Sequence, residues 1–167
     1  VIGGSKSDYV TGLDLDEYGN AYICGYTESD DFPTTPGALQ ETFLGDSQTG
    51  FYNSFLFKLN SAGSTLIYSS FLIGWTVKTL YERTFVADIK VNTKGEAIIT
   101  GWTGCSSFPV TMDAFQKTQH RNGFNDAFIS RFSTDGGRLL YSTYFGGKSH
   151  DHGESVAINE NGDVIIV

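Results

Sequence analysis

One stretch of this sequence occurs twice, and that repetition limits what the chain can fold into more than any other feature. Residues 52–74 read YNSFLFKLNSAGSTLIYSSFLIG, and residues 125–147 read NDAFISRFSTDGGRLLYSTYFGG. Each copy has two largely apolar runs around a polar turn that ends in Gly, which is typical of a β-hairpin. The chain is therefore predicted to be an array of one hairpin-rich unit. At an offset of 73 residues, six positions are identical: Phe55/Phe128, Gly63/Gly136, Leu66/Leu139, Tyr68/Tyr141, Ser69/Ser142 and Gly74/Gly147.

A second hairpin pattern occurs three times. In each copy a polar residue precedes a Gly by three positions, and apolar runs flank the turn on both sides. The three pairs are Asp16/Gly19, Asn92/Gly95 and Asn159/Gly162. Between the two kinds of hairpin lies a block that reads DFPTTPGALQ at residues 31–40 and SFPVTMDAFQ at residues 107–116. Pro excludes a central strand here, so we expect an ordered connection whose Phe enters the core, with one helical turn at residues 38–40.

Two hairpins per repeat give four strands, which is the content of one β-propeller blade. We predict an all-β protein of four-stranded antiparallel blades, with strands at residues 10–16, 20–26, 52–60 and 64–73 and at the equivalent later positions. About two and a third repeats cannot close a ring, so we expect a fragment of a larger propeller, completed by further blades of the same chain in preference to blades from other chains. The expected division is the end of a preceding repeat (1–9), unit one (10–74), unit two with a loop insertion at 75–86 (75–147) and the start of unit three (148–167).

Composition agrees with this class and excludes others. Aromatic residues make up 14% of the chain, and there are 20 Gly but only 3 Pro, which suits strands joined by Gly turns. The net charge of −8 argues against nucleic acid as a partner. No apolar run is long enough for a membrane-spanning helix, so we expect no membrane insertion by this segment. Cys24 and Cys105 occupy different repeat positions, and we expect two separate buried thiols.

The three motifs together resemble the SBBP type of β-propeller repeat. The resemblance rests on DFPTTPGALQ, on NSFLFKLNSAGSTLIYSSFLIG and on GLDLDEYGNAYICGYT, and it covers nearly the whole chain. Unit two departs from the pattern at Val110, at Met112–Asp113 and in its insertion after Ile73–Gly74. The resemblance implies a secreted or surface-displayed protein of bacteria or archaea, so the expected location is extracellular or at the cell surface. It carries no catalytic motif.

One short motif could hold a metal. In the extended stretch His150–Asp151–His152 the two imidazoles would share a face, and imidazole is a good ligand for zinc or copper. Only the acid recurs, because the equivalent residues near the start are Ser7–Asp8–Tyr9. A turn or a backbone-capping role for Asp8 and Asp151 is therefore the preferred interpretation. We predict no metal site, no cofactor and no catalytic residue.

Aromatic side chains near the variable loops are the better functional indication. Aromatic residues on loops can stack on sugars or anchor protein contacts, although large apolar side chains more often seal a core. The candidate binding residues are Trp75, Tyr81, Phe85, Phe43, Phe51 and Tyr52.

Two functions remain open at this point. The first is a noncatalytic surface module, acting as scaffold, adhesin or assembly subunit, that binds protein or glycan at the cell surface through its loops. The second is a secreted carbohydrate-active hydrolase or lyase with its site at the propeller channel. The regular repeats favour the first, since a channel site would need recurring polar residues.

Overall fold

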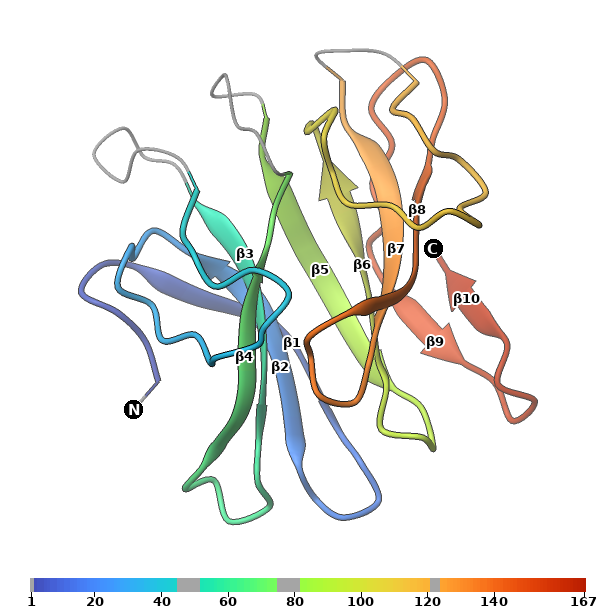
Figure 1. Cartoon of the computed structure of the whole chain (residues 1–167). Helices are drawn as coiled ribbons and strands as arrows, with labels where there is room; N and C mark the ends of the chain where they lie inside the picture. The colour runs from blue at the N-terminus through green and yellow to red at the C-terminus, as the bar shows by residue number, and fades with distance from the viewer. Residues whose placement is uncertain (1, 45–51, 75–81, 121–123) are drawn as a thin grey trace.

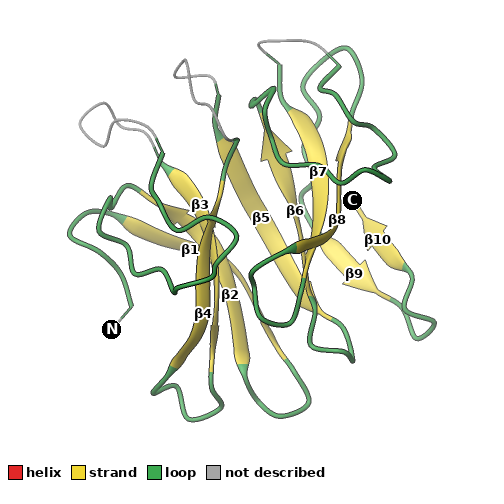
Figure 2. Ribbon diagram, in the orientation of Figure 1, coloured by secondary structure: helices red, strands yellow, loops and turns green. Residues whose placement is uncertain are grey.

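The computed structural model describes residues 2–44, 52–74, 82–120 and 124–167. The described residues form ten β-strands and no helix (Figure 2). None of them forms a helix long and apolar enough to cross a lipid bilayer. The strands are β1 (Asp8–Leu15), β2 (Ala21–Thr27), β3 (Asn53–Leu59), β4 (Leu66–Leu72), β5 (Thr84–Val91), β6 (Ala97–Thr103), β7 (Asp126–Phe132), β8 (Leu139–Phe145), β9 (Val156–Ile158) and β10 (Val164–Ile166).

The strands form three antiparallel sheets, each built in simple sequence order. The sheets are β1-β2-β3-β4, β5-β6-β7-β8 and the pair β9-β10. Figure 1 shows them side by side in chain order. The expected all-β fold of four-stranded, propeller-like blades is confirmed.

The turn residues explain why the strands end where they do. The Gly residues at 19, 63, 95, 136 and 162 all have positive φ, the left-handed conformation that Gly adopts without the steric cost of a side chain. At residue 63, for example, the Gly N–H donates to the carbonyl of Asn60 across 2.8 Å. Each hairpin predicted from the polar-to-Gly spacing is present.

The main core lies between the first two sheets. Alternate residues of each strand face opposite sides, so one face of each sheet contributes its side chains to this core. Leu56 of β3 faces this core together with Ile89 and Phe128 of the second sheet, and all three are fully buried. On the other face of the first sheet, Phe55 and Phe57 form a second cluster with Phe32. Both thiols are buried in the main core and unpaired, as expected. Burial raises the pKa of Cys24 to about 12.

The proline-containing connection of unit one covers the outer edge of its sheet. Thr35 donates its N–H to the carbonyl of Ser69 in β4 and accepts the N–H of Ser69 on its hydroxyl. Phe71 donates its N–H to the carbonyl of Gln40 across 3.0 Å, and Ile73 donates to the Gln40 side chain across 3.1 Å. The edge that β4 would otherwise expose is therefore paired, which protects the sheet against association.

Unit two repeats this arrangement with the equivalent residues. Thr111 makes the same two bonds to Ser142 in β8. Tyr144 donates its N–H to the carbonyl of Gln116, and Gly146 donates to the Gln116 side chain. The two blocks thus recur because each edge strand needs the same hydrogen-bond partners.

Two details of the expected fold are wrong. Residues 38–40 are not helical, because Pro36 and Gly37 form the centre of a turn in which Ala38 donates its N–H to Thr35 across 3.1 Å. The φ of Gly37 is +81°, which a type II turn requires at that position and a helix does not allow. The insertion predicted at residues 75–86 is too long at its end, since β5 already begins at Thr84.

Candidate functional site

A row of packed aromatic rings runs from the first sheet across the second and ends in the segment before β9. We call these residues the aromatic row: Tyr9, Tyr26, Phe85, Trp102 and His152. Successive ring centroids lie 4.8, 5.2, 5.4 and 5.3 Å apart. The row lies at the end of the strands opposite the Asp16 and Asn92 turns, because its members stand near the start of β1 and β5 and the end of β2 and β6.

Strand register and the repeat place these rings together. Tyr9 is paired across the strands with Tyr26, and Phe85 with Trp102. Phe85 follows Tyr9 by 76 residues, and Trp102 follows Tyr26 by 76. Each of the two four-stranded sheets therefore contributes one cross-strand pair, and Tyr26 of the first pair packs on Phe85 of the second with the ring planes tilted by 42°. Recurrence of an aromatic at the same repeat position is the sequence signal that could have identified the row.

The row is half open to solvent and has polar groups at its rim. Tyr9 is 48% exposed, His152 is exposed, and the three rings between them are half-buried. Tyr52 packs beside Tyr26, with ring centroids 5.1 Å apart, and the guanidinium of Arg83 lies 4.9 Å from the Tyr52 ring. Burial raises the pKa of Tyr52 although Arg83 acts to lower it, so its hydroxyl keeps its proton at neutral pH.

The structure brings two of the six predicted aromatic residues into this region and separates a third from it. Phe85 belongs to the row, although it lies in β5 and not in a loop as predicted, and Tyr52 borders the row. Phe43 packs instead on Phe71, edge to face, at the second hydrophobic cluster. Trp75, Tyr81 and Phe51 lie outside the described residues. Sequence reasoning did not identify Tyr9, Tyr26 and Trp102, and it considered His152 only as a possible metal ligand.

The acid at the centre of His150–Asp151–His152 has a backbone-capping role. Asp151 accepts the N–H of Gly147 across 2.7 Å. The equivalent Asp8 accepts the N–H of Gly4 across 2.8 Å, so the predicted capping role is confirmed. Within the described part of the chain, no three His, Cys, Asp or Glu side chains are grouped so that they could hold a metal ion.

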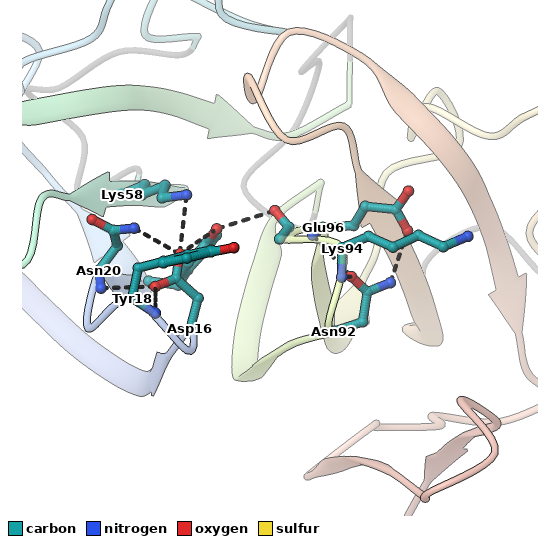
Figure 3. A network of polar contacts seen from close by, with 9 residues as sticks. Asp16, Tyr18, Asn20, Lys58, Asn92, Lys94 and Glu96 are labelled. Carbon is teal, nitrogen blue, oxygen red and sulfur yellow. Dashed lines mark hydrogen bonds and ion pairs between the residues drawn. The ribbon is translucent and has the colours of Figure 1, made fainter.

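At the opposite end of the strands, Asp16 is the centre of a polar network (Figure 3). Its carboxylate accepts hydrogen bonds from the backbone N–H and the side-chain amide of Asn20, and it lies 3.2 Å from the ammonium of Lys58. Partial burial opposes ionisation, but the bonds from Asn20 and Lys58 outweigh it and hold the pKa of Asp16 at about 2. The Tyr22 hydroxyl lies 3.1 Å from the carbonyl oxygen of Gly95, which joins this network to the next sheet.

The later units use the same pairing with acid and amide exchanged. Asn92 donates its side-chain N–H to Glu96 across 2.8 Å, and Asn159 donates to Asp163 across 2.8 Å. Arg131, the equivalent of Lys58, lies 3.8 Å from Glu96. Each turn thus holds an acid–amide pair four residues apart, and the first two also have a cation beside it. These side chains hold the turns in shape. Because each acid is already bonded to an amide, the turns are better suited to binding a ligand than to transferring protons.

Comparison with known proteins identifies the repeat. Residues 1–33 match the family model described as the SBBP beta-propeller repeat. A search of the curated proteins found no match. The match begins before β1 and extends through β2 to Pro33, so it covers the first hairpin and the start of the connection that follows. Residues 1–33 therefore carry the SBBP β-propeller repeat, the family that the sequence resembles.

Proposed function

We propose that this protein is a noncatalytic extracellular or cell-surface β-propeller module that acts as a scaffold and binds protein or glycan at the end of the blades where the aromatic row lies. The observation that carries the proposal is the row itself. Four rings from the first two sheets and the His152 ring, in the segment before β9, pack one against the next and remain partly exposed. Rigid aromatic side chains offer a large contact area at low entropic cost.

The recurring polar groups support a noncatalytic role. Asp8 and Asp151 bond to backbone N–H groups, and so do two acids at the sheet junctions. Asp14 accepts the N–H of Val91, and Asp88 accepts the N–H of Val156. A general acid and base would need carboxyl groups that are free to exchange protons with a substrate, whereas these four carboxylates hold the backbone in place.

Binding measurements on variants of Trp102 test the proposal. The purified protein is screened against an oligosaccharide array and against a displayed library of random peptides. We expect Trp102→Ala to weaken binding of the selected ligands at least tenfold, and Trp102→Phe to retain most of it. Met112→Ala is the control, because Met112 is a large apolar residue that is 93% exposed and lies outside the row. Circular dichroism verifies that each variant is folded.

Two results would contradict the proposal. Equal binding by Trp102→Ala and the control would exclude the aromatic row as the binding surface. Product formation from an arrayed oligosaccharide would favour the carbohydrate-active enzyme in place of a noncatalytic module.

A further inference from the structure

The junctions between the sheets hold two polar clefts at the end opposite the aromatic row. The first cleft lies between the Asp16 turn and the Asn92 turn and has a volume of about 190 Å³. The second lies between the Asn92 turn and the Asn159 turn and has a volume of about 330 Å³. The first is smaller than the pockets that hold drug-sized ligands, roughly 300–1,000 Å³, and the second is at their lower limit. Their size suits one small polar unit.

The two clefts are built from equivalent repeat positions. Lys58 lines the first cleft and Arg131, 73 residues later, lines the second. Lys94 lines both, because its turn is shared between them. The main difference is at the third turn position, where Tyr18 and Lys94 of the first cleft correspond to Lys94 and Asn161 of the second.

Tyr18 gives the first cleft a flat apolar wall. The side chain is 75% exposed, and none of the ring–ring contacts found among the described residues involves it. This sets Tyr18 apart from the aromatic row, whose inner rings cover each other's faces. A hydrogen bond to Glu17 raises the pKa of the Tyr18 hydroxyl. Figure 3 shows Tyr18 beside Asp16, facing the turn that carries Asn92 and Lys94.

The rest of the first cleft offers hydrogen-bond donors and acceptors with balanced charge. Two acids, Asp16 and Glu17, stand against two lysines, Lys58 and Lys94. Asp16 and Lys58 are already paired with each other. Glu17 also accepts the hydroxyl of Tyr18, so a ligand meets Lys94, the remaining acceptor positions of the Glu17 carboxylate and the hydroxyl groups of the cleft wall. This combination favours a neutral ligand with several hydroxyl groups over an ion.

We propose that the first cleft binds a single neutral pyranose unit of a glycan. One face of the sugar ring stacks on Tyr18, and its hydroxyl groups bond to Lys94 and Glu17 and to the hydroxyls of Thr93 and Thr134, which also line the cleft. The second cleft has Lys94 but no aromatic wall, so we assign the sugar to the first. This site is separate from the aromatic row and does not depend on what the row binds.

Titration with simple sugars tests this site. The purified protein is titrated with the methyl glycosides of glucose, galactose, mannose and N-acetylglucosamine, followed by calorimetry and by saturation-transfer NMR. We expect saturable binding of at least one glycoside in the millimolar range. Tyr18→Ala and Lys94→Ala should each weaken it at least fivefold, and Tyr18→Phe should keep most of the affinity, because the ring remains.

The controls separate this inference from the proposed function. Lys148→Ala removes an exposed lysine that lines neither cleft, and Trp102→Ala alters only the other end, so both should bind the glycoside as the unmodified protein does. Absence of saturable binding for all four glycosides would overturn the inference. So would a Tyr18→Ala variant that is folded and binds with unchanged affinity. Loss of binding in Trp102→Ala alone would place the sugar at the aromatic row instead.

Discussion

The carboxylate of Asp14 in β1 accepts a hydrogen bond from the backbone N–H of Val91 in β5, with 2.8 Å between oxygen and nitrogen. The bond crosses from one sheet to the next, where β1 and β5 are the edge strands. At the following junction, Asp88 of β5 accepts the N–H of Val156 in β9 across 3.0 Å. Asp14 and Asp88 are not at equivalent repeat positions. At both junctions an Asp carboxylate nevertheless accepts a backbone N–H of the edge strand in the next sheet.

Removal of the Asp14 carboxylate should destabilise the protein. Asp14→Ala leaves the partly buried N–H of Val91 without its partner, and the expected loss in the free energy of unfolding is about 1–3 kcal/mol. Asp14→Asn retains an acceptor oxygen of similar shape and should lose less. Urea denaturation followed by circular dichroism measures both. Equal stability of Asp14→Ala and the unmodified protein would mean that water replaces the carboxylate at this junction.

Gln40 should stabilise the outer edge of the first sheet through its side chain. In Gln40→Ala the backbone bond to Phe71 remains, but the N–H of Ile73 loses its acceptor in a buried place. We expect the free energy of unfolding to fall by about 1–3 kcal/mol and the variant to aggregate more readily, since an unpaired edge can associate. Denaturation and light scattering check the two effects. Thr42→Ala, at an exposed position two residues further on, is the control and should change neither.

Most of the fold could be predicted because Gly turns punctuate the repeat. The strands expected at 10–16 and 64–73 are found at Asp8–Leu15 and Leu66–Leu72, so the limits differ by at most two residues. β5 begins at Thr84, two residues before the position equivalent to residue 10, so its start differs from the prediction by as much as that of β1. Residues 38–40 were wrongly predicted to be helical. The prediction did not take into account that Pro36–Gly37 favours a type II turn.

The candidate site was harder to predict because it depends on contacts between repeats. Phe85 and Tyr52 were identified only as aromatic residues near loops. Their common neighbour, Tyr26, is at the end of an apolar run inside a predicted strand and was therefore assigned to the strand and not to a loop. The row becomes visible once the pairing of Tyr9 with Tyr26 and the stacking of Tyr26 on Phe85 in the next sheet are known. Periodicity within one strand does not contain that information.

Asp16 should make the protein sensitive to acid. Its pKa is about 2 in the folded protein against an ordinary value of 3.8. A carboxyl group whose pKa is lowered by folding stabilises the folded protein at any pH above the pKa that the group has in the unfolded chain. This stabilisation is lost as the pH falls from about 4 towards 2. The midpoint of urea denaturation, measured between pH 7 and pH 2, should therefore fall less steeply at the acidic end in Asp16→Asn. Asn already occupies the equivalent turn position at residues 92 and 159, so the variant should keep its turn. Parallel acid profiles for the two proteins would contradict the assignment.

Gly101 should be intolerant of any side chain, because it allows β5 and β6 to approach beside the aromatic row. A Cβ at this position would overlap the carbonyl oxygen of Phe85, and the equivalent Cβ at Gly25 would overlap the carbonyl oxygen of Tyr9. Both contacts occur next to a β-bulge, where a strand bends and its side chains are redirected. Gly101→Ala must move Phe85 or separate the strands, and overpacking of this kind costs about 1–3 kcal/mol or more.

The control for this substitution is Gly147→Ala. A Cβ at Gly147 would have its nearest neighbouring atom at 3.8 Å, which is ordinary van der Waals contact, so this variant should unfold at nearly the same urea concentration as the unmodified protein. Gly101→Ala should unfold at a clearly lower concentration. Its Trp102 fluorescence, recorded with Trp75 replaced by Phe in both proteins, should also change, because Trp102 stacks on Phe85 at 5.4 Å. An unchanged midpoint together with an unchanged spectrum would show that the two strands can separate without disturbing the row.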